Sequence, residues 1–276
     1  MPSRRSARAP LLALAALAAC VPTRHPPPDL SLEPRALLEQ VRSASRTVAR
    51  VQGEARLRVE APGKKGAAPA FVAVERPDRL HVEVLDFFGN PAAVLVVANG
   101  RLAIDDRRAR TFYRGTATAA NLARLVPLPL PPERLVAVLL GAPPLDGEPV
   151  SVEPATGHVT LLLRDPPRST ELRVGSRAAI ERATYLGEPG VPDHDVTYRS
   201  FLDLLGGRFA TEVAISAPSA GVRVELVWKE PDLTAPVEAT LFRLEPPAGA
   251  RVVDLDAAPE PVPELPLGPP PPSGAP

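Results

Sequence analysis

The chain has 276 residues, enough for one large domain or two small ones. Its 32 basic and 32 acidic residues give a formal net charge of zero, and no basic stripe stands out, which argues against a nucleic acid as partner. Hydrophobic residues make up 45% of the chain, enough for a sizeable core. A lone cysteine, Cys20, excludes an internal disulfide, so core packing must hold the fold.

The first 19 residues read as a signal peptide. Arg4, Arg5 and Arg8 form a positive start, and Leu11–Ala19 contains only leucine and alanine. That apolar run is too short to span a bilayer, which needs about 20 residues. We therefore predict export of residues 20–276.

The segment Leu17–Cys20 resembles a lipobox, the cleavage motif of bacterial lipoproteins. The resemblance implies cleavage before Cys20, which then carries a covalent diacylglycerol and an N-acyl chain such as palmitate. The alternative is an ordinary secretory signal with an incidental cysteine. Val21 in place of an aspartate favours the outer membrane, so we expect a lipid-anchored protein whose domain lies in the periplasm. Residues 20–30 are proline-rich and predict a stiff tether.

A helix is predicted over 31–50, since Leu37, Val41, Ala44 and Val48 recur at helical spacing. Alternating or apolar runs then predict strands, and Asn99-Gly100 is a strong hairpin turn. The predicted strands are 54–60, 71–74, 80–84, 92–98, 102–105, 110–114, 157–164, 169–174, 178–186, 194–200, 208–216 and 221–229, with short helices at 119–126 and 132–140. The connections are too short for crossover helices, which predicts an antiparallel meander.

No domain boundary is visible between these elements, so residues 31–256 are predicted to form one domain. The tail 257–276 is rich in proline and is predicted to be disordered.

Seven segments in this order resemble LolB-like outer-membrane lipoproteins of the LolA/LolB superfamily: Pro77–Pro91, Asn99–Leu102, Phe112–Gly115, Asn121–Leu122, Pro131–Gly141, Leu241–Leu244 and Pro246–Gly249. The resemblance covers about residues 35–255. It implies a mainly β fold with a few helices, a curved antiparallel half-barrel whose apolar concave face is covered by a helical lid.

LolB accepts lipoproteins from the periplasmic carrier LolA and places them in the outer membrane. The resemblance thus implies an apolar cavity that binds lipoprotein acyl chains, with a LolA-like carrier as partner and no cofactor beyond the lipid on Cys20. Half of the residues of each strand point inward. The expected cavity wall is Leu57, Val59, Val72, Val74, Val82, Val84, Val94 and Val96. The alternative is that these side chains fill a closed core.

Phe87 and Phe88 precede Gly89-Asn90 between two predicted strands, where turn chemistry predicts exposure. In LolB-like proteins the equivalent loop carries a protruding apolar residue that helps deliver cargo to the membrane, and Phe88 matches it best. The alternative is that both rings tuck under the lid helices. The segment Leu125–Leu130 is either a mobile apolar lid or a rigid connector, and we favour the connector.

A metal or acid–base cluster is suggested at first by Asp193-His194-Asp195. Strand alternation sends His194 and Asp195 to opposite faces, however, and no second histidine lies near in sequence, so no metal site is predicted. Nucleophile-elbow and phosphate-loop motifs are missing, so we do not expect an enzyme. The rival to acyl-chain transfer is a non-transporting lipoprotein of the same fold that serves envelope assembly or structure.

Overall fold

The computed structural model describes residues 25–123, 128, 130–187 and 192–257. Cys20 and the predicted signal peptide lie outside the described residues, as do the tether before His25 and the tail after Ala257. The predictions made for these segments, and for the limits of the domain, stay predictions.

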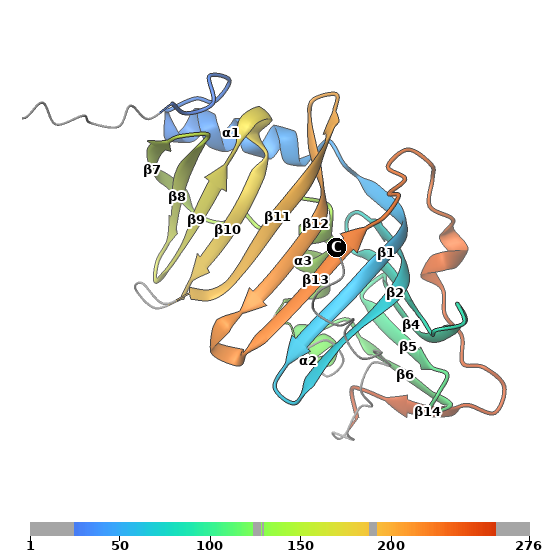
Figure 1. The fold of residues 1–276 in the computed structure, drawn as a ribbon. Helices are drawn as coiled ribbons and strands as arrows, with labels where there is room; N and C mark the ends of the chain where they lie inside the picture. The colour runs from blue at the N-terminus through green and yellow to red at the C-terminus, as the bar shows by residue number, and fades with distance from the viewer. Residues whose placement is uncertain (1–24, 124–127, 129, 188–191, 258–276) are drawn as a thin grey trace, which may run out of the picture.

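The described chain is mainly β and forms one open, curved sheet of 14 strands (Figure 1). The strands are β1 (Arg50–Ala61), β2 (Lys64–Glu75), β3 (Arg79–Leu85), β4 (Pro91–Ala98), β5 (Arg101–Asp106), β6 (Thr111–Thr116), β7 (Glu148–Ala155), β8 (His158–Asp165), β9 (Arg168–Val174), β10 (Ile180–Leu186), β11 (Pro192–Leu204), β12 (Gly207–Ala217), β13 (Val222–Trp228) and β14 (Arg251–Asp254). Their order in the sheet is β14-β6-β5-β4-β3-β2-β1-β13-β12-β11-β10-β9-β8-β7.

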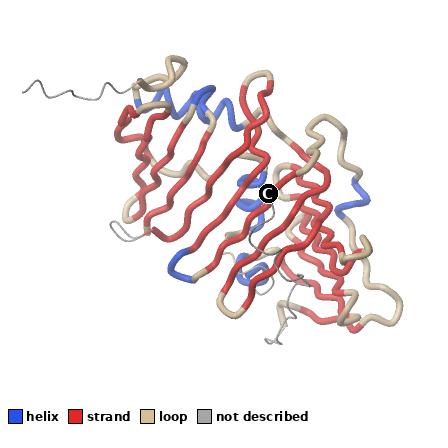
Figure 2. The backbone as a smooth tube through the Cα atoms, in the orientation of Figure 1, coloured by secondary structure: helices blue, strands red, loops and turns tan. Residues whose placement is uncertain are grey.

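Two antiparallel meanders, β1–β6 and β7–β13, make up this sheet, and the pairing of β1 with β13 joins them. Leu57 pairs with Leu226 and Val59 with Val224 across that junction. Strand pairing therefore runs without a break through the middle of the molecule, as the continuous strands of Figure 2 show.

Side chains alternate across the sheet at this junction. On the outer face the Arg58 guanidinium lies 3.4 Å from the Glu225 carboxylate, whereas Leu57, Val59 and their partners are buried on the concave face. The alternation of polar and apolar side chains predicted for residues 54–60 is thus present in β1.

The first helix is shorter than predicted: α1 is Pro34–Ser45, not 31–50. Glu33 caps its start, because its carboxylate accepts the Ala36 N–H at 2.6 Å. At the other end the Arg76 guanidinium donates to the carbonyls of Ser45 (3.0 Å) and Val48 (3.2 Å), groups that a longer helix would bond internally. The chain then passes directly into β1.

Helices α2 (Ala119–Ala123) and α3 (Pro132–Leu139) lie in the connection between the two meanders. Both helices stand behind the sheet in Figure 1, and α3 faces the concave side of the sheet through Leu135 and Leu139. Helix α3 ends as predicted at Gly141, whose φ of +73° closes the helix.

Two strands were not predicted. β7 contains Pro149 and Pro154, which obscured it, and proline is tolerated there because β7 is the edge of the sheet. β14 pairs in parallel with β6, through contacts such as Val252 with Phe112, and forms the other edge.

The segment after β13 covers the outer face of β2–β4. Val237 and Phe242 bury a small cluster with Ala73 and Ala98, and His81 Nδ1 lies 2.8 Å from the Leu241 carbonyl oxygen. The short helix η3 (Ala239–Phe242) lies against β3 and β4. The outer face of β2–β4 is therefore partly buried as well as the concave face, whereas the side chains of Arg79 and Glu83 on that outer face remain partly exposed.

Replacing Phe242 by alanine tests this cover. The ring is buried against the outer face, so Phe242→Ala should lower the free energy of unfolding by about 3 kcal/mol, measured by urea denaturation at unchanged slope. Val252→Ala on the exposed side of β14 is the control and should change it by less than about 0.5 kcal/mol. Equal effects of the two changes would contradict a buried role for Phe242.

Candidate functional site

An apolar cavity lies between the concave face of the sheet and α3. Its volume is about 70 Å³, and every residue that lines it is apolar. The lining residues are Leu57, Val59, Val72, Leu80, Val82, Val84, Ala93, Leu95, Ile104, Leu128, Leu135, Leu139, Val213, Ile215, Val224 and Leu226. They come from β1–β5, β12 and β13 on one side, and from α3 and the chain before it on the other.

Two periodicities build the lining. Leu80, Val82 and Val84 alternate along β3 and face inward, whereas His81 and Glu83 between them lie on the outer face. On the opposite side Leu135 and Leu139 are four residues apart and share one face of α3. The sheet and the helix thus each direct a row of apolar side chains into the cavity.

Five of the eight residues predicted for the cavity wall line it: Leu57, Val59, Val72, Val82 and Val84. Val74 is fully buried on the same side of β2 but belongs to the core beyond the cavity.

Val94 and Val96 do not line the cavity, and their predicted orientation was wrong. Ala93 and Leu95 of β4 face it instead. The segment Ala92–Ala98 is apolar at every position because the C-terminal segment covers the outer face of β4. The sequence therefore contains no polar residue that would distinguish the outer face of this strand from its concave face.

Sequence reasoning missed the part of the wall supplied by β12, β13 and α3. The alternation of Val222, Val224, Leu226 and Trp228 did predict a strand, but not its pairing with β1. A pairing between strands 167 residues apart leaves no local signal in one sequence.

Polar contacts hold α3 and the chain after it against the sheet. The Tyr198 hydroxyl donates to the Val138 carbonyl at 3.0 Å, and the Tyr185 hydroxyl donates to the Pro144 carbonyl at 2.9 Å. Arg134 on α3 lies 2.9 Å from Asp146. We call Tyr185, Tyr198 and the Arg134–Asp146 ion pair the α3 latch.

Burial keeps the two latch tyrosines protonated. It raises the pKa of Tyr198 well above its ordinary value, and burial also raises the pKa of Tyr185 against the opposing charge of Arg134. Both hydroxyls therefore remain hydrogen-bond donors at any physiological pH.

His194 stacks on Tyr185, with ring centroids 4.4 Å apart and planes 13° from parallel. Burial lowers the pKa of His194, although the Asp193 carboxylate, 3.3 Å from Nδ1, opposes that shift. Asp195 lies on the other face of β11 and pairs there with Arg182 at 3.2 Å. The predicted separation of His194 and Asp195 is therefore confirmed, and no metal-binding group of three such side chains occurs among the described residues.

Phe87 and Phe88 stand in solvent at the β3–β4 turn, with exposed fractions of 96% and 83%. Asp86 fixes this turn, because its Oδ1 accepts the N–H of Phe88 at 2.8 Å and of Asn90 at 2.9 Å. The rings meet edge to face, 5.6 Å apart. Their predicted exposure is confirmed, and they do not tuck under α2 or α3.

Within the described residues, no helix has the length and apolar character needed to cross a membrane. In the Leu125–Leu130 segment Leu128 and Leu130 are described and buried, and the other residues on which the predicted connector depends lie outside the described residues.

No protein-family model matches this sequence, and comparison with curated proteins gives no significant match. Solved structures do resemble it. A LolA superfamily protein of Nitrosomonas europaea matches with a TM-score of 0.52 at 14% identity, over 78% of this chain and 99% of that one. A domain of Vibrio parahaemolyticus, named for outer membrane lipoprotein sorting, matches with a TM-score of 0.52 at 8% identity, over 75% and 94%.

A DUF1329 family protein of Desulfovibrio piger is similar as well, with a TM-score of 0.51 at 11% identity, over 77% of this chain and 98% of that one. These matches span nearly the whole of each solved chain. At such low identity they establish one property, that this chain has a LolA-like fold.

The lowered pKa of His194 predicts that the free energy of unfolding decreases in acid. An unfolded histidine titrates near about pH 6.5, and the fold lowers that pKa, so the unfolded state binds the proton more readily. The contribution of neutral His194 to stability is therefore present above about pH 6.5 and is lost as the pH falls through the lowered value. The free energy of unfolding is measured in urea at about pH 8 and at about pH 5. Its decrease between the two pH values should be smaller in His194→Gln than in the parent.

The matched control for this change is His158→Gln at the start of β8, away from the contact of His194 with Tyr185. If the free energy of unfolding of His194→Gln decreases in acid as much as that of the parent, the buried imidazole is not the cause of the decrease.

Proposed function

We propose that this LolA-like fold belongs to an outer-membrane lipoprotein that binds acyl chains in its cavity and assists lipoprotein localisation. One observation carries the proposal: the concave wall and α3 enclose a space with no polar lining residue. Acyl chains need a dry, adaptable surface and no catalytic group.

The cavity must open to do this. An apolar cavity of about 150 Å³ accommodates benzene, so a space of about 70 Å³ is too small for an acyl chain. Helix α3 supplies Leu135 and Leu139 to the lining. Together with Leu128 they close the side of the cavity that lies opposite the sheet. We infer that α3 acts as the lid and that the structure is its closed form.

The energies allow such an opening. The latch consists of two hydrogen bonds and an exposed ion pair, worth about 1 kcal/mol or less each. Each methylene transferred from water to an apolar site contributes about 0.8 kcal/mol. Ten methylenes therefore outweigh the latch, provided that the side chains of α3 repack on the ligand.

The proposed setting follows from the N-terminus. A lipid on Cys20 would hold the domain at the outer membrane, facing the periplasm, where a LolA-like carrier would bring the cargo. The lipoprotein-sorting name of the Vibrio domain supports this assignment through its shared fold.

The second candidate is a non-transporting envelope assembly or structural lipoprotein of the same fold. The small volume of the cavity favours it, because a permanently closed cavity would be an ordinary core. The two candidates differ in one property, whether α3 can leave the wall without unfolding the sheet.

Loosening the latch separates them. In Tyr185→Phe/Tyr198→Phe the rings stay and two hydrogen bonds of about 1 kcal/mol each are lost, which favours the open form by up to about 30-fold. The apparent affinity for a fluorescent fatty acid should rise by up to that factor, measured by titration of the full chain. Val84→Asp, which places a charge in the cavity, should abolish saturable uptake.

The matched control is Val159→Ala, a buried change on β8 outside the cavity, which should lose stability without gaining affinity. If the double variant only unfolds more easily and binds no fatty acid, the second candidate is correct.

The Phe87–Phe88 tip is the proposed element through which cargo passes to an apolar acceptor. Phe88 is exposed and supports no core, so Phe88→Glu should leave the free energy of unfolding in urea within about 0.5 kcal/mol of the parent. The same variant should transfer a bound fluorescent lipid to acceptor vesicles severalfold more slowly. An unchanged transfer rate with unchanged folding would remove the tip from the mechanism.

A further inference from the structure

A second apolar tip stands at the opposite end of the strands. Leu205 and Gly206 form the two-residue turn between β11 and β12, and Leu205 is 99% exposed. Gly206, with a φ of +90°, is the usual residue for such a turn, but a fully exposed leucine beside it is not. Leu202 on the same hairpin is 42% exposed.

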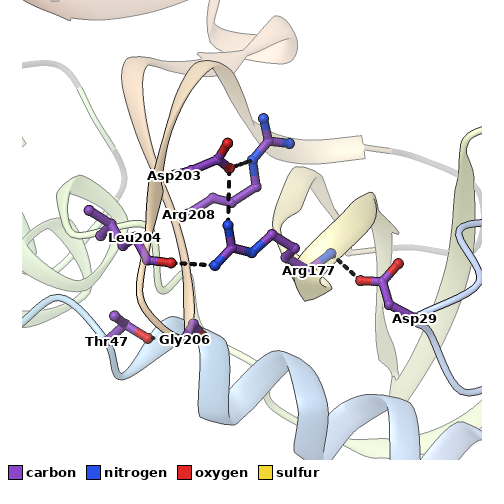
Figure 3. Close-up of polar contacts among 7 residues, drawn as sticks. All are labelled: Asp29, Thr47, Arg177, Asp203, Leu204, Gly206 and Arg208. Atoms are coloured by element: carbon purple, nitrogen blue, oxygen red, sulfur yellow. Dashed lines mark hydrogen bonds and ion pairs between the residues drawn. The ribbon is translucent and has the colours of Figure 1, made fainter.

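This tip is held in place from two sides (Figure 3). Arg177, in the β9–β10 loop, donates from Nη2 to the Leu204 carbonyl and lies 3.5 Å from Asp203, which also accepts from Arg208 at 3.0 Å. From the other side the Thr47 hydroxyl donates to the Gly206 carbonyl at 3.3 Å. Exposure of Leu205 is therefore a property of a fixed hairpin and not of a frayed one.

Arg177 also fixes the chain that leads back to the predicted lipid anchor. Its backbone N–H donates to the Asp29 carboxylate (Figure 3). Arg177 has a φ of +57°, an unfavourable value for a non-glycine residue that persists because these contacts hold it. One residue thus binds both the tether and the β11–β12 tip.

The length of the tether then places the membrane. The first described residue, His25, accepts the Gly157 N–H through its carbonyl at 3.0 Å, at the β7–β8 turn, which lies at the same end of the strands as the β11–β12 turn. The five residue steps from Cys20 to His25 reach about 17 Å even when fully extended. A lipid on Cys20 therefore keeps the bilayer close to the end of the sheet where Asp29, Arg177 and Leu205 meet. Leu32, just after the tether, is also exposed, at 53%.

We propose that the β11–β12 tip, with Leu205 foremost, rests on the surface of the bilayer that holds Cys20. The inference depends on the lipid anchor of the proposed function, but not on acyl-chain binding in the cavity. The occupant is a lipid surface because the anchor brings it within reach of the tip. Arg177 and Arg208 are already paired with acidic groups, so the contact is apolar and needs no anionic lipid.

This resting position turns the Phe87–Phe88 tip away from the membrane. β3 and β11 run in opposite directions through the sheet, so the β3–β4 and β11–β12 turns lie at opposite ends of the strands. At rest the two phenylalanines would face the periplasm, so the passage of cargo through them to this membrane requires the tethered domain to turn over. One leucine binds a bilayer weakly, so the contact requires the tether, which keeps the local lipid concentration high.

Tryptophan probes test the resting position. The full lipidated chain is reconstituted in phosphatidylcholine vesicles that carry a doxyl-labelled phosphatidylcholine as quencher. The parent, whose Trp228 is 4% exposed, gives the background. We expect Leu205→Trp to show blue-shifted emission and severalfold stronger quenching than Phe88→Trp or the control Arg168→Trp at the exposed β8–β9 turn. Arg177→Ala, which frees tip and tether together, should reduce the quenching at position 205.

Flotation of the same vesicles checks the premise. The parent should float with the vesicles and Cys20→Ser should not. If the parent does not float, both the lipid anchor and this inference are wrong. Fatty-acid uptake by the cavity is measured in a separate experiment, whose result does not depend on flotation. A floating parent with stronger quenching at position 88 than at 205, or with none at 205, overturns this inference alone.

Discussion

The pairing of β1 with β13 is the constraint on which the rest of the structure depends. It joins two meanders that are each built from local hairpins, and it places Leu57 and Val59 beside Leu226 and Val224 in one wall. Because the meanders meet there, β6 and β7 lie toward opposite edges of the sheet, and the chain between them carries α2 and α3. Helix α3 packs on the concave side of this joined wall, and the cavity lies between the two.

Local patterns predicted much of this architecture. Alternation identified β1, β3 and β13, and Gly141 predicted the end of α3, because these signals depend only on which face is wet. β7 was missed because its own prolines hide the strand pattern, whereas the other errors originate in contacts between residues distant along the chain. Val94 and Val96 were placed on the wrong face because η3 dries the outer side of β4, and the predicted first helix was too long because Arg76 bonds the carbonyls at its end. β14 was missed because its partner β6 lies far away in sequence.

Polar groups in this molecule act mainly as restraints on apolar surfaces. The hydroxyls of Tyr185 and Tyr198 hold α3 over the dry wall, and Arg177 holds the β11–β12 tip together with Asp29. Each restraint is a small number of hydrogen bonds, weak compared with the apolar area that it controls. In the proposed function these restraints keep the cavity closed in water, and its opening toward a hydrocarbon chain is the step that the proposal requires.

Locating a bound acyl chain tests this account most directly. The full chain would be crystallised with a long-chain fatty acid brominated at its end, and the bromine would be found by anomalous scattering. The account predicts bromine between Leu57 or Val84 and a displaced α3, over an unchanged sheet. Bromine only on the outer surface, or a closed α3 at saturating ligand, would contradict it and leave the cavity as part of an ordinary core.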